Sequence, residues 1–191
     1  MGKLKFSFAT PADEIVLKQF LETNNLLNED IEPADLKHFL MARDGTEVIG
    51  LVGLEIKADC ALLRSLAVKK DYRNKGLATL LVDKIEEHAR TLNINTLYLL
   101  TLTAEAFFSQ HEFKRTEREM APRGIQNTAE FKDLCPASAA LMVKTIAAGT
   151  QGEFLQRKEL RGELNDGQNF GEDEKRRVLP GKSPGKKRKI I

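Results

Sequence analysis

A short segment near the middle of the chain combines residue types that suit phosphate binding. It reads Arg73-Asn74-Lys75-Gly76-Leu77-Ala78 and opens an amphipathic stretch. The N-terminus of a helix presents unpaired backbone N–H groups and the positive end of the helix dipole, which together attract anions. Gly76 and Ala78 leave room for a phosphate to approach the backbone, and Arg73 and Lys75 add positive charge. We therefore expect this segment to bind a pyrophosphate.

The segment differs from two better-known phosphate loops. It lacks the Gly-Lys-Ser/Thr of a Walker loop, and it lacks the Gly-x-Gly of a dinucleotide-binding turn. The pattern Arg-x-x-Gly-x-Ala is short, so a second interpretation stays open: a helix start whose small residues only serve packing.

Two charged residues on neighbouring predicted strands are candidates for contact with a substrate. Arg64 interrupts an apolar strand, and its guanidinium is suited to hold a carboxylate in a bidentate pair. Alternatively, Arg64 faces solvent or pairs with Glu55. Glu55 is itself a candidate general base, although a solvated strand-end charge is the simpler interpretation.

The cysteines and histidines show no metal-binding spacing. Cys60 and Cys135 lie far apart, which excludes a disulfide framework and fits the reducing cytosol, so we expect a cytoplasmic protein. Cys135 is a candidate thiol ligand, but a buried packing residue is the simpler interpretation. His38, His88 and His111 form no metal pattern, and we expect no metal site.

The hydrophobic pattern of the chain predicts the strands and helices on which these candidate residues lie. The hydrophobic periods predict strands over 4–8, 38–42, 47–56, 61–68, 96–102, 113–118 and 138–146. They predict helices over 10–24, 76–92, 104–110 and 124–134, with a further short helix ending near Lys37. Arg64 then lies on a strand, and the phosphate segment starts the helix that follows.

The composition divides the chain into a body and a tail. Residues 1–148 carry a net charge of −2 with ordinary apolar content, whereas residues 149–191 carry +4 with nine apolar residues among 43. Such a tail buries too little apolar surface to offset the entropy of ordering, so we expect it to be a disordered charged extension. The chain contains no apolar run long enough to cross a bilayer, and its first six residues alternate polar and apolar types, so we expect neither a membrane span nor a secretory signal. The body is not basic enough for a nucleic-acid platform.

The order of elements and the phosphate segment together resemble the GNAT superfamily of N-acetyltransferases over residues 4–146. The resemblance implies an α/β (α+β) fold, with a mixed, mostly antiparallel central sheet flanked by helices and with splayed central strands. It implies that the backbone of Leu66, Ala67 and Val68 pairs with the pantetheine arm of acetyl-CoA. It also implies that the pyrophosphate is held by Arg73, Asn74, Lys75, Gly76, Leu77 and Ala78.

The superfamily's chemistry is direct attack of an amine on the thioester carbonyl. Backbone N–H groups near Leu66 and Val68, freed where two strands splay apart, would polarise that carbonyl. Arg64 lies close to the acyl group in this arrangement and is our predicted substrate contact.

The sequence departs from the superfamily where the departing thiolate is usually protonated. The usual Phe-Tyr is here Phe107-Phe108, and the following Gly-Phe is Glu112-Phe113. Phe108 has no proton to give, and without the glycine the following turn is expected to differ. Ser109, Thr101, Thr103 or water remain open as substitutes. We assign no catalytic residue and expect any turnover to be slow.

A narrower resemblance, to acetyltransferase-like proteins of bacterial arsenic-resistance operons, depends on scattered motifs. The most distinctive is Cys135-Pro136-Ala137-Ser138-Ala139, and others are the segments 63–68, 98–101, 104–108 and 128–131.

Three functions remain in competition. The first is an acetyl-CoA-dependent N-acetyltransferase acting on a small amine or amino-acid-like molecule, as a monomer or a homodimer, without a membrane or specific nucleic acid as partner. The second is an acyl-CoA-binding module with little or no transferase activity. The third is a protein that binds nucleic acid or another partner through its basic tail.

Overall fold

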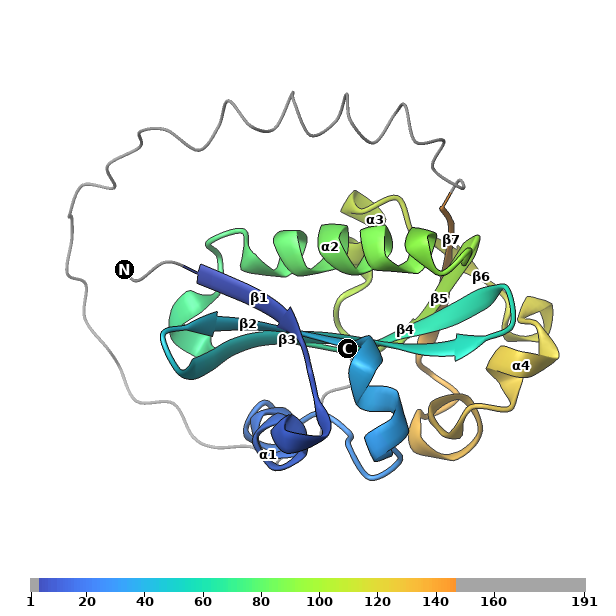
Figure 1. Ribbon diagram of the computed structural model, residues 1–191. Coiled ribbons are helices and arrows are strands. Elements are labelled where there is room, and N and C mark those ends of the chain that lie inside the picture. The colour runs from blue at the N-terminus through green and yellow to red at the C-terminus, as the bar shows by residue number, and fades with distance from the viewer. Residues whose placement is uncertain (1–3, 147–191) are drawn as a thin grey trace, which may run out of the picture. The chain divides into compact units, whose positions relative to one another are not determined.

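The computed structural model describes residues 4–146 as a seven-stranded sheet with helices on both faces (Figure 1). In chain order the elements are β1 (Leu4–Phe8), α1 (Glu14–Thr23), β2 (Phe39–Asp44), β3 (Glu47–Lys57), β4 (Cys60–Val68), α2 (Leu77–Thr91), β5 (Thr96–Thr101), α3 (Glu105–Gln110), β6 (Lys114–Thr116), α4 (Arg123–Gln126) and β7 (Ala140–Thr145). A 3-10 turn, Pro11–Asp13, precedes α1, and another, Pro33–His38, leads into β2.

The sheet order is β1-β2-β3-β4-β5-β7-β6, and the β4–β5 pair is parallel while the others are antiparallel. The predicted fold class, a mixed and mostly antiparallel sheet flanked by helices, is confirmed. The tail at 149–191 lies outside the described residues, so the predicted domain boundary stays a prediction. Within the described part of the chain, no helix is long and apolar enough to cross a membrane.

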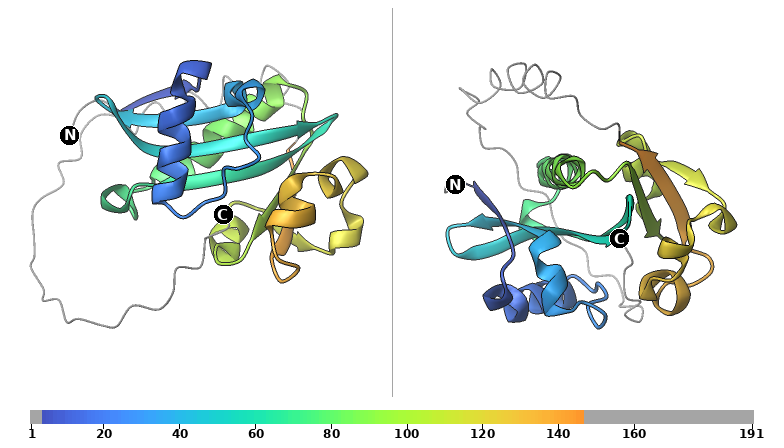
Figure 2. Two further views of the ribbon diagram at one scale, coloured as in Figure 1. Left: turned by 90° about the horizontal axis from the view of Figure 1, so that it is seen from below. Right: turned by 45° about the vertical axis from the view of Figure 1, so that its right-hand side comes forward.

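Each face of the sheet is covered because the helices are amphipathic. One stripe of α2, including Leu81 and Ile85, is buried against β3 and β4, and α1 buries Leu17 and Leu21 on the opposite face (Figures 1 and 2). Gly53 of β3 packs so closely on the same face as α1 that a Cβ atom there would lie 2.5 Å from the Phe39 ring.

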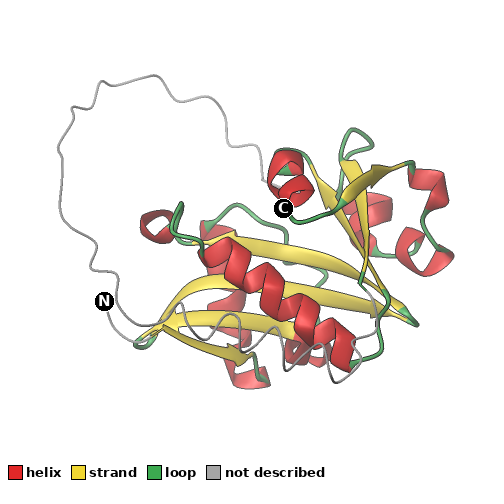
Figure 3. Ribbon diagram, turned by 90° about the horizontal axis from the view of Figure 1, so that it is seen from above, coloured by secondary structure: helices red, strands yellow, loops and turns green. Residues whose placement is uncertain are grey.

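The two central strands pair over only part of their length. β4 pairs with β5 from Cys60 to Leu62, and the remainder of β4 has no partner strand on that side among the described residues. Beyond this point β5, β6 and β7 turn away from β1–β4 (Figures 2 and 3). The predicted splay of the central strands is thus confirmed, and it exposes one edge of β4.

A β-bulge interrupts β4 where the splay opens. The β3–β4 register shifts by one residue between Leu51 and Gly53, and β4 takes up the extra residue around Ser65, whose φ is +60°. A non-glycine residue in this region of φ is uncommon, and bulges re-aim the side chains and N–H groups next to them.

The predicted helix over 124–134 is wrong in its continuity. The structure has a short α4 and a separate π-helical turn, Glu130–Leu134. The Thr128 hydroxyl donates to the Ile125 carbonyl at 2.8 Å and accepts from the Phe131 N–H at 3.3 Å. Such side-chain bonds compete with the regular helix ladder, which explains the break.

Candidate functional site

The loop that starts α2 presents free backbone donors. Asn74 and Gly76 both have positive φ, +59° and +77°, so the chain turns sharply before the helix. The first bond within α2 joins the Leu80 N–H to the Gly76 carbonyl at 3.1 Å. The N–H groups of Leu77, Ala78 and Thr79 precede it and have no intrahelical acceptor, as at any helix start. This geometry fits an anion with several acceptor oxygens.

The two basic side chains of this loop, Arg73 and Lys75, have different surroundings. Arg73 donates through Nε to the Val68 carbonyl at 2.8 Å and through Nη2 to Asn24 Oδ1 at 3.0 Å. It therefore fixes the loop to the end of β4 in addition to supplying positive charge. Lys75 is exposed, with its ammonium 5.7 Å from the centre of the Tyr72 ring.

The free edge of β4 also carries backbone donors. The Lys69 N–H donates to the Ile49 carbonyl of β3 at 2.8 Å. Because N–H groups alternate between the two sides of an extended strand, those of Val68 and Leu66 point the other way, into the splay. The structure thus brings the strand residues and the α2 loop, the two predicted halves of one binding site, next to each other.

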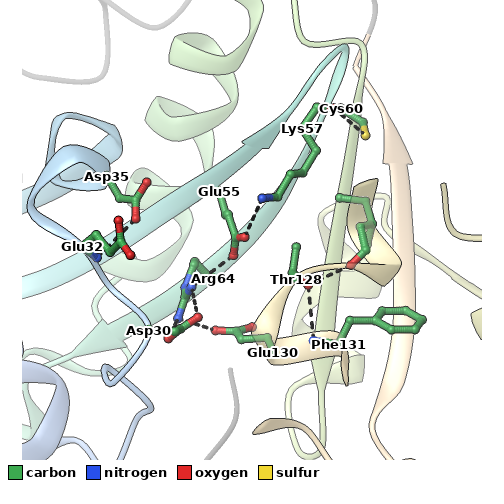
Figure 4. A network of polar contacts seen from close by, with 11 residues as sticks. Asp30, Glu32, Asp35, Glu55, Lys57, Cys60, Arg64, Thr128, Glu130 and Phe131 are labelled. Atoms are coloured by element: carbon green, nitrogen blue, oxygen red, sulfur yellow. Dashed lines mark hydrogen bonds and ion pairs between the residues drawn. The ribbon is translucent and has the colours of Figure 1, made fainter. Parts of the chain in front are cut away.

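Arg64 lies at the centre of a buried ion-pair cluster on the face of the sheet opposite α2 (Figure 4). Asp30 accepts from both Nη atoms at 2.6 Å, and Glu55 accepts from Nη1 at 3.2 Å. Glu130 Oε1 lies 3.0 Å from Nη2. The alternative that Arg64 faces solvent is wrong, because its side chain is 3% exposed, and the alternative that it pairs with Glu55 is confirmed. The carboxylate that Arg64 binds in a bidentate pair is therefore that of Asp30, a residue of the same chain.

Asp30 and Glu130 are parts of this cluster that sequence reasoning missed. Asp30 comes from the connection between α1 and β2, and Glu130 comes from the π-helical turn. No local pattern around either residue signals this pairing, because Arg64 lies far from both in the sequence.

Burial raises the pKa of Glu130 to about 7, because desolvation disfavours the carboxylate. Arg64 opposes that rise, whereas the negative charges of Asp30 and Glu55 add to it. Glu55 also pairs with Lys57 at 3.1 Å, so it is not the simply solvated charge of the alternative interpretation.

Phe108 is fully buried at the end of α3. Its ring packs edge-on against Phe107 and Phe113, with centroids 5.1 and 5.5 Å away. Helix α3 ends with the Phe113 N–H bonded to the Phe108 carbonyl at 3.1 Å and the Glu112 N–H bonded to the Ser109 carbonyl at 3.1 Å. These two bonds define a Schellman motif, and Glu112 takes its left-handed position with φ +67°. The helix therefore ends in the turn that glycine usually makes, although Glu112 replaces the glycine.

The remaining candidate residues, the two cysteines and three histidines, have surroundings typical of residues that stabilise the fold. Cys60 and Cys135 are buried in a cluster around α4, and burial raises the pKa of the Cys135 thiol to about 12. His38 and His88 lie with ring nitrogens 3.4 Å apart, and His111 contacts Thr79. Residues 4–146 hold no group of three or more side chains placed to bind a metal ion.

Comparison with known proteins gives one consistent result. Residues 8–115 match the model of the acetyltransferase (GNAT) family. The chain is 33% identical over 116 residues to an uncharacterized N-acetyltransferase of Chlorobaculum tepidum, and the match covers 58% of this chain and 72% of that protein. It is 35% identical over 65 residues to the amino-acid acetyltransferase of Ectopseudomonas mendocina, but this covers only 34% of the chain and 15% of that protein.

Solved structures share the fold. The N-acetylglutamate synthase of Neisseria gonorrhoeae, complexed with coenzyme A and L-arginine, superposes with a TM-score of 0.64 at 18% identity over 77% of this chain and 34% of that one. A Mycobacterium tuberculosis protein in complex with CoA superposes with a TM-score of 0.62 at 21% identity, over 74% of this chain and 99% of that one. With the family match over residues 8–115, these findings show that the chain belongs to the acetyltransferase (GNAT) family and is an N-acetyltransferase.

Proposed function

We propose that this chain transfers the acetyl group of acetyl-CoA to the amine of a small, amino-acid-like acceptor by direct attack. The observation that carries the proposal is the free edge of β4 beside the N-terminus of α2. There the N–H groups of Leu66 and Val68 face the splay, and those of Leu77 and Ala78 open the helix.

The donor side of the site follows from these backbone groups. Acetyl-CoA supplies a thioester whose carbonyl carbon an amine can attack. We assign the pantetheine arm to the backbone of Leu66, Ala67 and Val68, and the pyrophosphate to the loop from Arg73 to Ala78. Backbone dipoles suit the developing oxyanion because they are fixed in place and need no reorganisation.

The acceptor side is the face that carries the Arg64 cluster. Arg64 remains our proposed substrate contact, since its Nε–H has no hydrogen-bond partner among the described residues and is free for a carboxylate oxygen. An amino-acid-like acceptor also agrees with the names of relatives, which include amino-acid acetyltransferases.

The second candidate is an acyl-CoA-binding module with little or no transfer activity. The buried ring of Phe108 favours it, because that position holds no hydroxyl for protonating the departing thiolate. A thiol has a reference pKa of about 8.5, so its thiolate can leave without an acid, and for this reason we prefer the enzyme.

The finer resemblance to arsenic-resistance proteins, the cytoplasmic location and the homodimer stay predictions. The first suggests one addition to any acceptor screen, namely arsenic-containing amino acids.

The experiment separates the candidates in two steps on the purified full chain. Titration calorimetry with acetyl-CoA and with CoA is expected to show binding of both, and absence of binding would contradict enzyme and binder alike. A thiol-release assay over a panel of amino acids and simple amines is then expected to show turnover with at least one acceptor. Binding without release from any acceptor would support the binding module instead.

A further inference from the structure

Three buried polar atoms in the described part of the chain have no hydrogen-bond partner, and two of them belong to the residues of one ion pair. They are Arg64 Nε, Ser65 Oγ and Glu130 Oε2, and their residues are at most 3% exposed. Arg64 and Ser65 are neighbours in β4, and Glu130 Oε1 lies 3.0 Å from Arg64 Nη2 (Figure 4). Folded proteins leave few such atoms, and each one calls for an explanation. Because Arg64 Nε and Glu130 Oε2 belong to the two members of one ion pair, they point to a ligand that completes both.

The Arg64 Nε–H needs an acceptor, which the carboxylate of an amino-acid-like molecule supplies, whereas the charges around Glu130 favour a cationic group of the same ligand at Oε2. The carboxylates of Asp30, Glu55 and Glu130 surround the guanidinium of Arg64, and Lys57 pairs with Glu55 at 3.1 Å. With every group ionised the cluster carries one surplus negative charge. An ammonium group, with three N–H donors and no acceptor, matches a carboxylate oxygen that lacks a donor.

The cluster also lies beside the proposed reaction centre. Arg64 immediately precedes the bulge at Ser65, after which the Leu66 N–H points into the splay. Phe131, next to Glu130, packs against an apolar cluster that includes Leu62 of β4 and Leu100 of β5, the two central strands that separate beyond Leu62. An amine held at Glu130 therefore lies on the side of the splay opposite α2.

We propose, in an inference that rests on the proposed function, that Glu130 binds the ammonium group of the acceptor. Glu130 then takes the proton that this ammonium group must lose before the amine can attack. An N–H bond of the ammonium breaks and an O–H bond forms at Oε2, directly or through one water molecule. The freed electron pair forms the C–N bond to the thioester carbon, and the C–S bond breaks with its electron pair on sulfur. The second amine proton converts that thiolate to the thiol, and Glu130 returns its proton to solvent.

The protonation behaviour of Glu130 supports this role. Its pKa is raised to about 7 by burial, with Arg64 lowering it and Asp30 and Glu55 raising it further. Burial, with a smaller contribution from Glu130, raises the pKa of the Cys135 thiol to about 12, so this thiol is neutral at neutral pH. General bases work best with a pKa near the operating pH, and an α-amino group has a reference pKa of about 8.

Glu130→Gln tests the proposal, with Asp133→Asn as the matched control on the same π-helical turn, where Asp133 is exposed. We expect Glu130→Gln to lower kcat/KM about 100-fold or more at neutral pH. We expect the loss to shrink at high pH, where the acceptor amine is already deprotonated, and we expect CoA affinity by calorimetry to stay unchanged. Asp133→Asn should behave as the wild type in each assay.

The wild type provides an independent measurement should Glu130→Gln fail to fold. Its acid limb in kcat/KM is expected to stay near pH 7 for acceptors of different amine pKa. A limb that follows the amine pKa from acceptor to acceptor, or a Glu130→Gln variant with the wild-type rate and pH profile, would overturn the role of Glu130 and leave the proposed function intact. Absence of transfer by both wild type and Asp133→Asn would overturn the proposed function itself.

Discussion

At the residue scale, Glu112 holds a backbone conformation that suits glycine. Its φ of +67° places it in the left-handed region, and its side chain, 83% exposed, pairs with Lys144 at 3.5 Å. A left-handed conformation costs an L-residue about 1–2 kcal/mol, and an exposed ion pair contributes little. Glu112, in place of the usual glycine, therefore lowers the stability of the fold.

We expect Glu112→Gly to raise the free energy of unfolding by about 0.5–1 kcal/mol, since relief of strain exceeds the added entropy of the unfolded chain. Glu112→Ala is the control, because it removes the same side chain and keeps the strained conformation. Urea unfolding measures both variants. Equal stability of the two would refute the role of backbone strain.

The His38–His88 contact makes stability depend on pH. Burial lowers the pKa of both imidazoles below the usual 6.5. The unfolded chain then takes up protons first as the pH falls, so this contribution to stability is present above about pH 6.5 and is lost below it.

We expect the wild type to lose more stability than His88→Gln when the pH falls from about 7.5 to about 5.5. Comparing the two proteins cancels the opposite trend of Glu130, whose raised pKa favours the folded state at acid pH. Thermal melting at the two pH values is the measurement. Equal losses in both proteins would show that the pair has no such effect.

At the scale of the element, helix α2 has a proposed function at one end only. Thr79 and Thr91 are both exposed, and they lie at the N-terminal and C-terminal ends of the same helix. A negative charge stabilises a helix start and destabilises a helix end. The same charge at the start would repel a pyrophosphate bound there.

We expect Thr79→Glu to weaken CoA binding at least about tenfold while keeping or raising the melting temperature, since adjacent like charges oppose binding. Thr91→Glu should keep CoA affinity and lower stability slightly. Calorimetry and thermal melting separate the two effects. Unchanged CoA affinity in Thr79→Glu would place the pyrophosphate elsewhere.

Elements with a clear period were predictable from the sequence, and contacts between distant segments were not. The apolar stripe of α2 and the strands β2 to β5 follow directly from period and turn residues. The break in the predicted 124–134 helix depends on two hydrogen bonds of Thr128, which no periodicity reveals. Likewise, Arg64 was a visible candidate, but its partners Asp30 and Glu130 come from segments that only the folded sheet brings together.

At the scale of the whole molecule, residues 4–146 contain every contact on which the proposals depend. Its three apolar clusters lie within that range, as do the β4 edge, the α2 loop and the Arg64 cluster. We expect deletion of residues 149–191 to leave the melting temperature and CoA affinity unchanged. A clear fall in either would show that the tail takes part in the fold or the site.

The central claim, acetyl transfer to an amine, is tested most directly by measuring both products of one reaction. The full chain is incubated with acetyl-CoA and the best amino acid of the acceptor panel, and CoA thiol and N-acetylated amine are quantified over time. The account predicts equal amounts of the two products, formed over many turnovers and only in the presence of the amine. Tight CoA binding with no N-acetylated product, or thiol release that does not depend on the amine, would contradict it.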